Sequence, residues 1–211
     1  MKVLCFTTSY NRPKMLRSCI QDIANQTYSV HHVVNVAFDT EKQDYTSIIE
    51  DIGSNLTVVY NKNVHQQVNH MNAIKAVNYK DYDLFVKIDD DDIYKSDYVE
   101  NIVQCFEETK ADVTSSFIAD QLNGHTIYRG RYDNLGNKPE HTNFHMPMTF
   151  AFNRKALDLI IGLTDFYHYE DMMWRDEWTK AGLIHSTALN HESVIWYIHG
   201  KNISTANFLR S

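Results

Sequence analysis

Glycine, proline and cysteine are scarce in this 211-residue sequence, and each shortage excludes a kind of protein. Seven glycines and three prolines are too few for low-complexity tracts. Residues 7–13, which follow the first expected strand, contain no glycine, so a glycine-rich phosphate loop is not expected there. The three cysteines, Cys5, Cys19 and Cys105, are odd in number and lack the spacing of a metal site. We therefore expect a reducing compartment, with Cys5 and Cys19 as core thiols.

Basic charge and long apolar runs are also missing. The formal net charge is −7 and no basic stripe is present, which argues against nucleic-acid binding. No apolar run approaches the roughly 18 residues that a membrane span needs. The apolar run at residues 3–6 is too short for a signal peptide. We expect one cytoplasmic domain, either a free protein or one domain of a larger multidomain protein.

Apolar segments of strand length alternate with amphipathic segments of helix length. Such alternation is typical of parallel βαβ units, so we predict an α/β fold with a mostly parallel open sheet flanked by helices. Residues 123–145 are polar, aromatic and turn-rich, and they predict a β-ribbon or a loop covering the site. The expected strands are 2–8, 32–38, 55–60, 83–88, 113–118, 184–188 and 193–198; one expected helix begins at Pro13, and the others are 44–52, 66–79, 96–109, 153–161 and 169–181.

Polar residues follow three of the expected strands. Residues 7–12 end the first strand, Asp39 follows the second, and residues 89–92 follow the strand at 83–88. Ligands of open parallel sheets bind beyond the carboxyl ends of the strands. We therefore expect these three endings to form one site.

The strand at 83–88 stops in four consecutive aspartates, residues 89–92. Carboxylates about 4 Å apart repel by roughly 1 kcal/mol in water and about 4 kcal/mol at an effective dielectric constant of 20. A hard divalent cation offsets this repulsion because it takes carboxylate oxygens as ligands. The alternative is a solvated loop or a first helical turn, where the helix dipole favours acidic residues. An EF-hand is excluded because Tyr94 stands where that loop requires glycine.

Four segments occur in a familiar order: residues 7–13 (TTSYNRP), 23–28 (IANQTY), 88–94 (IDDDDIY), and Glu170-Asp171 with Arg175 followed by 199–204 (HGKNIS). In these segments the chain resembles the family-2 nucleotide-sugar glycosyltransferases of GT-A fold, over residues 2–205. The resemblance implies a single Rossmann-like GT-A domain over residues 1–211. Its nucleotide-binding half would run to about residue 120, and the half that binds acceptor and donor sugar from about residue 121.

The resemblance implies an enzyme that moves a sugar from a nucleoside diphosphate sugar to a glycan or other hydroxyl acceptor. Mn²⁺ or Mg²⁺ would offset the charge of the leaving diphosphate. Asp91 is the expected direct metal ligand, and Asp89 is expected to contact the ribose, or the metal through water. His199 is the expected third protein ligand, and Asp90 is the variable middle position.

The nucleotide site implied by the resemblance includes one residue that would contact the nucleobase. Asp39 is expected to accept a hydrogen bond from uracil N3–H, which favours a UDP-sugar. Residues 38–41 (FDTE) depart from the usual Asp-Asp-Gly-Ser pattern, so GDP and dTDP stay open. The residues implied to bind the nucleotide are Thr7, Ser9, Tyr10, Arg12, Asp39, Asn72, Asp89 and Asp90.

The paired acids Glu170 and Asp171 start an expected helix. By the resemblance, Asp171 is the general base that takes the acceptor's proton, and Glu170 positions the acceptor. This assignment favours inversion at the sugar, while a retaining enzyme on the same fold stays open. The alternative for the pair is a helix cap favoured by the dipole. Trp174 and Trp178, at i, i+4 spacing, are expected in the core.

Other functions are distinguished by what the sequence lacks. A nucleotidylyltransferase needs the glycine-rich loop that residues 7–13 do not provide. A processive polysaccharide synthase needs membrane spans and a Gln-x-x-Arg-Trp motif. A non-catalytic metal- or glycan-binding module stays open, and it predicts no dependence on nucleotide. In size and general pattern the chain is also similar to the glycosyltransferase domains that large chlorella viruses use on capsid glycans, which implies the host cytoplasm.

Overall fold

A computed structural model describes residues 1–41, 45, 55–116, 120–123, 126–128, 149–164, 170–188 and 194–198 of the chain. The helix expected at 44–52 lies outside these residues except for Tyr45, and so does most of the ribbon or loop expected at 123–145. Within the described part, no helix has the length and apolar character needed to cross a membrane.

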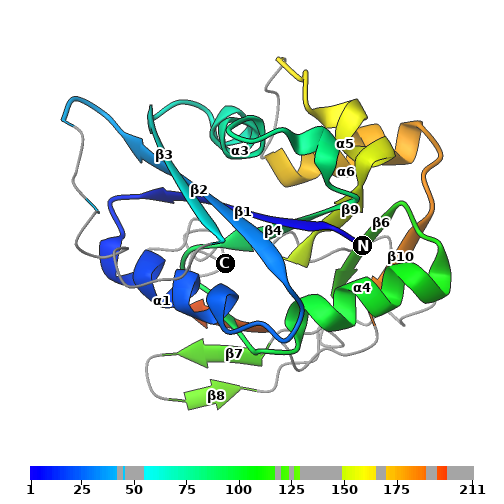
Figure 1. Cartoon of the computed structure of the whole chain (residues 1–211), viewed down its shortest axis with the longest axis horizontal. Coiled ribbons are helices and arrows are strands. Elements are labelled where there is room, and N and C mark those ends of the chain that lie inside the picture. Colours follow the sequence, from blue (N-terminus) through cyan, green and yellow to red (C-terminus); the bar gives the residue numbers. More distant parts are fainter. Residues whose placement is uncertain are drawn as a thin grey trace, which may run out of the picture.

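A mixed, mostly parallel sheet forms the centre of the protein (Figure 1). β1 pairs in parallel with β2 on one side and with β4 on the other. β9 runs antiparallel between β4 and β6, and its three residues are too few for a recognisable sequence period. The expected parallel open sheet is confirmed, and β9 was not predicted. In spatial order the seven strands are β10 (His185–Ala188), β6 (Val113–Ser116), β9 (Ala151–Asn153), β4 (Leu84–Asp89), β1 (Val3–Tyr10), β2 (Val30–Phe38) and β3 (Leu56–Lys62).

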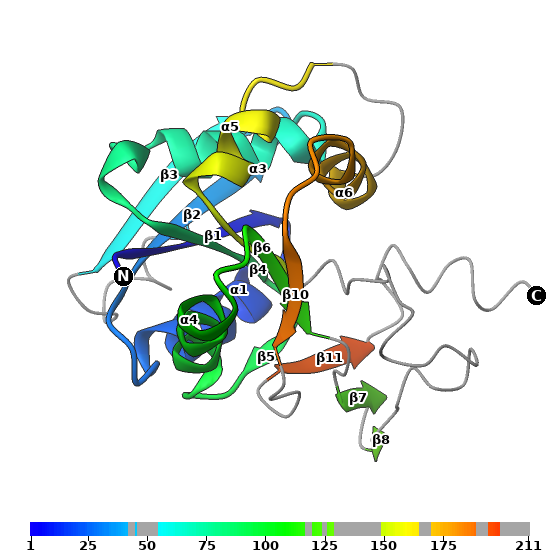
Figure 2. The same ribbon diagram turned by 90° about the vertical axis from the view of Figure 1, so that its right-hand side faces the viewer.

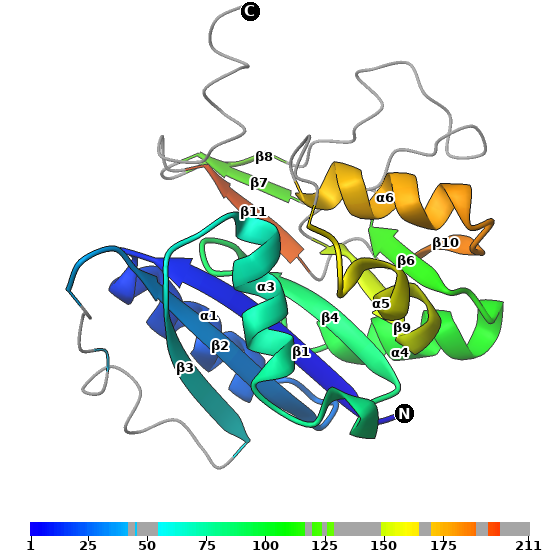
Figure 3. The ribbon, with the colours of Figure 1, turned by 90° about the horizontal axis from the view of Figure 1, so that it is seen from above.

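Helices cover both faces of this sheet (Figures 1 and 2). α1 (Pro13–Ala24) and α4 (Tyr98–Thr109) lie on one face. α3 (Gln66–Lys75), α5 (Arg154–Ile160) and α6 (Glu170–Lys180) lie side by side on the other (Figure 3). The connections from β1 to β2 through α1, from β3 to β4 through α3 and from β4 to β6 through α4 each cross one face of the sheet, which is how parallel strands are joined.

Helix starts and ends follow local chemistry. Pro13 opens α1 as expected, because a first-turn residue needs no N–H partner. Gly182 ends the α6 region with a left-handed φ of 65°. The helix expected at 66–79 is shorter than predicted: it ends at Lys75, and the chain tightens into a 3₁₀ turn at Tyr79–Asp81. The amide of Ala76 already bonds the carbonyl of Ala73 at 3.2 Å, which breaks the α-helical ladder.

A second, smaller sheet lies beside the aspartates at residues 89–92, named the aspartate loop from here on (Figure 2). β7 and β8 form an antiparallel hairpin, and β11 pairs in parallel with β7 and antiparallel with β5. β5 follows the four aspartates directly, so this sheet starts where the aspartate run ends. Its strands in spatial order are β5 (Ile93–Tyr94), β11 (Val194–Ile198), β7 (Asp120–Asn123) and β8 (Thr126–Tyr128).

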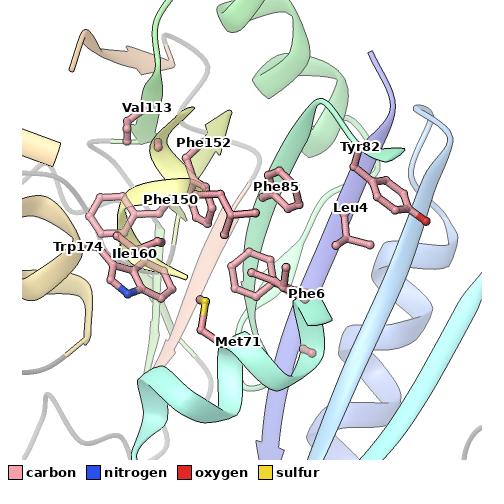
Figure 4. Packing of buried hydrophobic residues seen from close by; sticks show 14 of the residues in the cluster. Leu4, Phe6, Met71, Tyr82, Phe85, Val113, Phe150, Phe152, Ile160 and Trp174 are labelled. Atoms are coloured by element: carbon pink, nitrogen blue, oxygen red, sulfur yellow. The ribbon is translucent and has the colours of Figure 1, made fainter. Parts of the chain in front are cut away.

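The core beneath α3, α5 and α6 is rich in aromatic side chains (Figure 4). Phe85 and Phe152 stack with ring centroids 5.9 Å apart. Trp174 and Trp178 are fully buried, so their expected place in the core is confirmed. The indole N–H of Trp178 donates to the Ala156 carbonyl at 3.0 Å, which satisfies its one polar atom.

The opposite core, under α1 and α4, holds the expected thiols. Cys5 and Cys19 are fully buried, and both belong to the apolar cluster on this side. Their place as core thiols is confirmed. Burial raises the pKa of both, so they stay protonated and unreactive at neutral pH.

Phe152→Ala tests the aromatic core. Phe152 contacts Phe6, Phe85 and both tryptophans, so its truncation leaves a cavity that those rings cannot fill. We expect the free energy of unfolding to fall by about 3–5 kcal/mol, measured by urea titration. The control Leu159→Ala, on the exposed side of α5, is expected to change it by less than about 0.5 kcal/mol. Equal effects of the two variants would contradict the assignment of the core.

Candidate active site

The carboxyl ends of β1, β2 and β4 lie at one edge of the main sheet. In the parallel register Thr8 stands opposite Asp89, and Tyr10 stands opposite Ala37. The three polar strand endings therefore meet, as expected from the sequence. Side-chain hydrogen bonds and ion pairs divide this edge into three neighbouring parts.

The first part joins β1 to β2 through Asp39. The hydroxyl of Tyr10 donates to the Asp39 carboxylate, and the side-chain Nδ2 of Asn63 donates to Asp39 Oδ1 at 3.2 Å. The hydrogen bond to Asp39 raises the pKa of Tyr10. Both Tyr10 and Asp39 are exposed, so this carboxylate faces solvent as a hydrogen-bond acceptor at the sheet edge.

The second part joins β1 to the aspartate loop through Arg12. Arg12 Nη1 lies 2.9 Å from Asp90 Oδ1 and 2.7 Å from Asp91 Oδ2. Burial and the neighbouring Asp91 raise the pKa of Asp90 to about 7, against the opposing effect of Arg12. Burial alone would lower the pKa of Arg12, but the two carboxylates raise it above its ordinary value. One guanidinium thus pairs with two carboxylates.

Two other expected nucleotide residues, Thr7 and Ser9, have buried side chains. Thr7 Oγ1 is hydrogen-bonded to His32 Nε2 at 2.8 Å. Ser9 is 1% exposed. Asn72 lies half-buried on α3. The structure therefore brings Tyr10, Arg12 and Asp39 to the edge with their polar groups accessible, and it directs the hydroxyls of Thr7 and Ser9 into the protein.

The third part joins β4 to the start of α6. Lys87 Nζ lies 2.9 Å from Asp89 Oδ1 and 3.6 Å from Glu170 Oε1. Glu170 Oε1 is also 3.5 Å from His70 Nε2, and His70 Nδ1 is hydrogen-bonded to Thr8 Oγ1 at 3.1 Å. Burial alone would raise the pKa of Glu170, but His70 and Lys87 lower it to about 2. The two carboxylates on Lys87 raise its pKa despite its complete burial.

Sequence reasoning missed Lys87, His70 and Thr8 as members of this site. The signal for Lys87 was present, since it is the one charged residue inside the apolar run at 84–88. A lysine in a buried strand is rare unless it is paired. Its partners on α6 could not be read from the sequence.

Asp171 lies next to this buried group but in a different environment. It is partly buried, and its Oδ1 accepts a hydrogen bond from the amide of Met172 at 2.8 Å. Burial and the charge of Glu170 raise its pKa, against the opposing effect of Lys87. The pKa of Glu170 is therefore lowered and that of Asp171 is raised. Neighbouring acids whose pKa values are shifted in opposite directions are typical of groups with different roles in a reaction.

Side chains of residues 23–28 bond the chain that follows the aspartate loop. Gln26 Oε1 accepts from the amide of Val99 at 2.9 Å, and Gln26 Nε2 donates to the carbonyl of Lys95 at 2.8 Å. Thr27 Oγ1 donates to Glu100 Oε2 at 2.8 Å. These bonds tie the end of α1 to the start of α4. The loop between β4 and α4, which carries the aspartates, is thereby held at its α4 end.

Among the side chains that the structure describes, no group of three or more His, Cys, Asp or Glu residues is arranged as a metal site. The expected third ligand, His199, lies outside the described residues. Asp89 and Asp91 offer carboxylate oxygens at the sheet edge, and one buried oxygen of Asp90 has no hydrogen-bond partner. This donor set fits Mg²⁺ or Mn²⁺, because such ions often bind one or two carboxylates together with substrate phosphates and water.

Comparison with known proteins gives one family and a group of similar folds. The family model for "Glycosyl transferase family 2" matches residues 5–162. The structure is similar to S. aureus TarS residues 1–349 in complex with UDP-GlcNAc, with TM-score 0.72, 15% identity and coverage of 98% of this chain. It is also similar to the mannosyltransferase PcManGT from Pyrobaculum calidifontis in complex with GDP-Man and Mn²⁺, with TM-score 0.73, 16% identity and coverage of 99%.

The chain spans 61% of the TarS chain and 60% of the PcManGT chain. At these identities the likeness shows the fold. No curated protein sequence matches the chain significantly.

Glu170→Gln tests the electrostatics of the buried group. The folded-state pKa of Glu170, about 2, lies below its ordinary 4.5. Its carboxylate therefore stabilises the fold fully above pH 4.5, and the contribution is lost as the pH falls through about 2. We expect the variant to lose on the order of 3 kcal/mol of unfolding free energy at pH 7, and to show a flatter dependence of stability on pH between about 2 and 4.5.

The control is Glu177→Gln, which removes a partly exposed carboxylate further along the same helix. Its stability is expected to stay within about 0.5 kcal/mol of the parent at pH 7. Urea titrations across this pH range measure both variants. An unchanged pH dependence in Glu170→Gln would mean that Glu170 is not held as an ion.

Proposed function

The chain belongs to glycosyl transferase family 2 and has the GT-A-like α/β fold of that family, and on this premise we propose that it transfers a sugar from a nucleoside diphosphate sugar to a hydroxyl acceptor. We further propose that the favoured donor is a UDP-sugar, that Mn²⁺ or Mg²⁺ takes part, and that the reaction inverts the sugar with Asp171 as base. A glycan is the proposed acceptor. The division into halves near residue 120 stays a prediction.

One observation carries the proposal: the aspartate loop and the acid pair of α6 form one connected site. Asp89 at the end of β4 and Glu170 at the start of α6 share the ammonium of Lys87. A sugar transferase needs a place for the leaving diphosphate next to a base for the acceptor. The two acidic groups, far apart in sequence, supply those two requirements at one edge of the sheet.

The nucleotide is proposed to lie along the ends of β1 and β2. Asp39, fixed by Tyr10 and Asn63, is an exposed carboxylate that suits an N–H of the base. The two neighbours differ in nucleotide, since their complexes hold UDP-GlcNAc and GDP-Man. UDP is the proposed nucleotide because uracil N3–H can donate to this carboxylate; thymine N3–H and guanine N1–H can do the same, so the assay includes sugars of all three nucleotides.

The diphosphate is proposed to lie at the aspartate loop. Asp91 and Asp89 are the residues that would hold the metal, and His199 is the further proposed ligand. When bound, the metal would supply charge stabilisation to the departing diphosphate. Arg12, already at 2.7 Å from Asp91, adds a fixed positive charge at the same place.

Asp171 is proposed as the base because its surroundings differ from those of Glu170. Its raised pKa brings it closer to neutral pH, where a carboxylate accepts a proton more readily. Its partial exposure leaves it within reach of an acceptor. Glu170, at 4% exposed, has no such access.

Asp171→Asn tests the base. The assay offers UDP-, GDP- and dTDP-sugars with Mn²⁺ and a panel of hydroxyl acceptors, and it follows release of the nucleoside diphosphate. We expect kcat to fall at least about 100-fold, because an amide cannot take the acceptor's proton. The dissociation constant of the donor should stay within about twofold, as its binding groups are untouched.

The matched control is Asp176→Asn, an acid on the partly exposed side of the same helix paired with Arg175. It should keep full turnover. Turnover by Asp171→Asn at the rate of this control would remove Asp171 from the mechanism.

Asp91→Asn tests the metal. Calorimetric titration with UDP is done with Mn²⁺ and again with EDTA. We expect the parent to bind UDP more tightly with Mn²⁺, and the variant to lose at least about tenfold in affinity with Mn²⁺ present. Asp158→Asn, exposed on α5, is the control. A protein that binds no UDP, and in parallel titrations no GDP or dTDP, under either condition would instead favour a non-catalytic module.

A further inference from the structure

Lys87 is a fully buried ammonium with carboxylate partners on two different elements. It projects from β4 on the same face as Phe85 and Asp89, because side chains on a strand alternate between faces. That face packs beneath α3, α5 and α6. Asp89 lies on its own strand, whereas Glu170 comes from α6. The ammonium therefore connects the sheet to the helix.

Keeping this charge inside the protein costs free energy, because the ammonium loses its contacts with water. Desolvation of a buried ion takes several kcal/mol, and an ion pair often stabilises a fold no better than apolar residues of similar volume. The neighbouring positions in β4, Phe85, Val86 and Ile88, are all apolar and fully buried. An apolar residue at position 87 would satisfy packing at lower cost, so stability alone does not account for the lysine.

Glu170 is the first residue of α6, and its carboxylate pairs with the ammonium of Lys87. Glu170, Trp174 and Trp178 recur at four-residue spacing and are all buried, so they lie on the face of α6 that meets the protein. Trp174 is fixed to α3 by its hydrogen bond to Gln67, and Glu170 is fixed to β4 by Lys87. These contacts determine both the depth of α6 and its rotation about its own axis.

The rotation of α6 decides where Asp171 points. Consecutive residues of an α-helix differ by about 100° around the axis. With Glu170 directed into the protein at Lys87, Asp171 is turned away from that face and is only partly buried. Freeing Glu170 frees the first turn of α6, which carries the proposed base.

We propose that Lys87 is a positioning residue: by bridging Asp89 and Glu170 it holds the first turn of α6, and with it Asp171, in register with the aspartate loop. The proposal rests on the proposed function of this site and adds to it that Glu170 acts through Lys87 and does not touch the acceptor. Lys87 itself contacts neither substrate nor metal. Its role is to fix the distance between the diphosphate side and the acceptor side.

The test compares Lys87→Met, Glu170→Met and the double variant. Each single variant leaves a buried charge without one partner and is expected to lower Tm. The double variant replaces the pair with apolar side chains of similar length, and its Tm is expected to return close to that of the parent. The double variant is therefore expected to remain folded even if Lys87→Met does not.

Turnover separates positioning from stability. The double variant is expected to keep kcat about 100-fold below the parent, since a misplacement of about 1 Å has an effect of that size. The KM of the donor is expected to change less than about threefold in Glu170→Met, where the Lys87–Asp89 pair is intact. Recovery of kcat together with Tm in the double variant would overturn the proposal and leave the pair a purely structural one.

Hydrogen exchange supplies a readout that needs no activity. The amides of residues 174–177 are the first to bond within α6, and they are expected to exchange faster in the double variant than in the parent. Lys155→Met is the matched control, because it breaks a Lys–Asp pair of 3.0 Å at the opposite end of the sheet, and it should change neither kcat nor exchange in α6. Unchanged exchange in the double variant would also overturn the proposal. A parent protein that transfers no sugar would refute the proposed function alone, with the exchange result still deciding the role of Lys87.

Discussion

The ion pair of Lys87 with Asp89 and Glu170 is the interaction on which the site depends. It is the contact by which β4 holds α6, and its three charged groups lie at the boundary between core and edge. Around it the core is apolar and closely packed with aromatic rings, which fixes the ammonium in place. The low polarity of that core strengthens the attraction between the ions and makes any loss of one partner expensive.

Positive charge is distributed over this edge in two fixed places. Arg12 forms ion pairs with Asp90 and Asp91, and Lys87 forms ion pairs with Asp89 and Glu170. The acidic run is thereby tolerated by the fold, and it keeps carboxylate oxygens at the surface for a ligand. Burial and the charge of Glu170 raise the pKa of Asp171, and the opposing effect of Lys87 does not offset them. The chemistry that we propose follows from this unequal distribution of charge.

Much of the fold was predictable because it depends on local patterns. The alternation of apolar strands and amphipathic helices gave the parallel sheet, Pro13 gave the start of α1, and the spacing of Trp174 and Trp178 gave their place in the core. The short antiparallel strand β9 escaped prediction because three residues have no measurable period. The early end of α3 at Lys75 escaped it because the apolar pattern continues past the last helical hydrogen bond.

The sequence alone determined that polar groups of β1, β2 and β4 would gather at one edge, because strand direction and side-chain alternation are local properties. Only the tertiary structure decided which of those groups contact one another. Lys87 meets Glu170 across a separation of 83 positions, and His70 joins them from a third element. Such contacts depend on the order of strands in the sheet and on the rotation of α6, which are set by packing of the whole core.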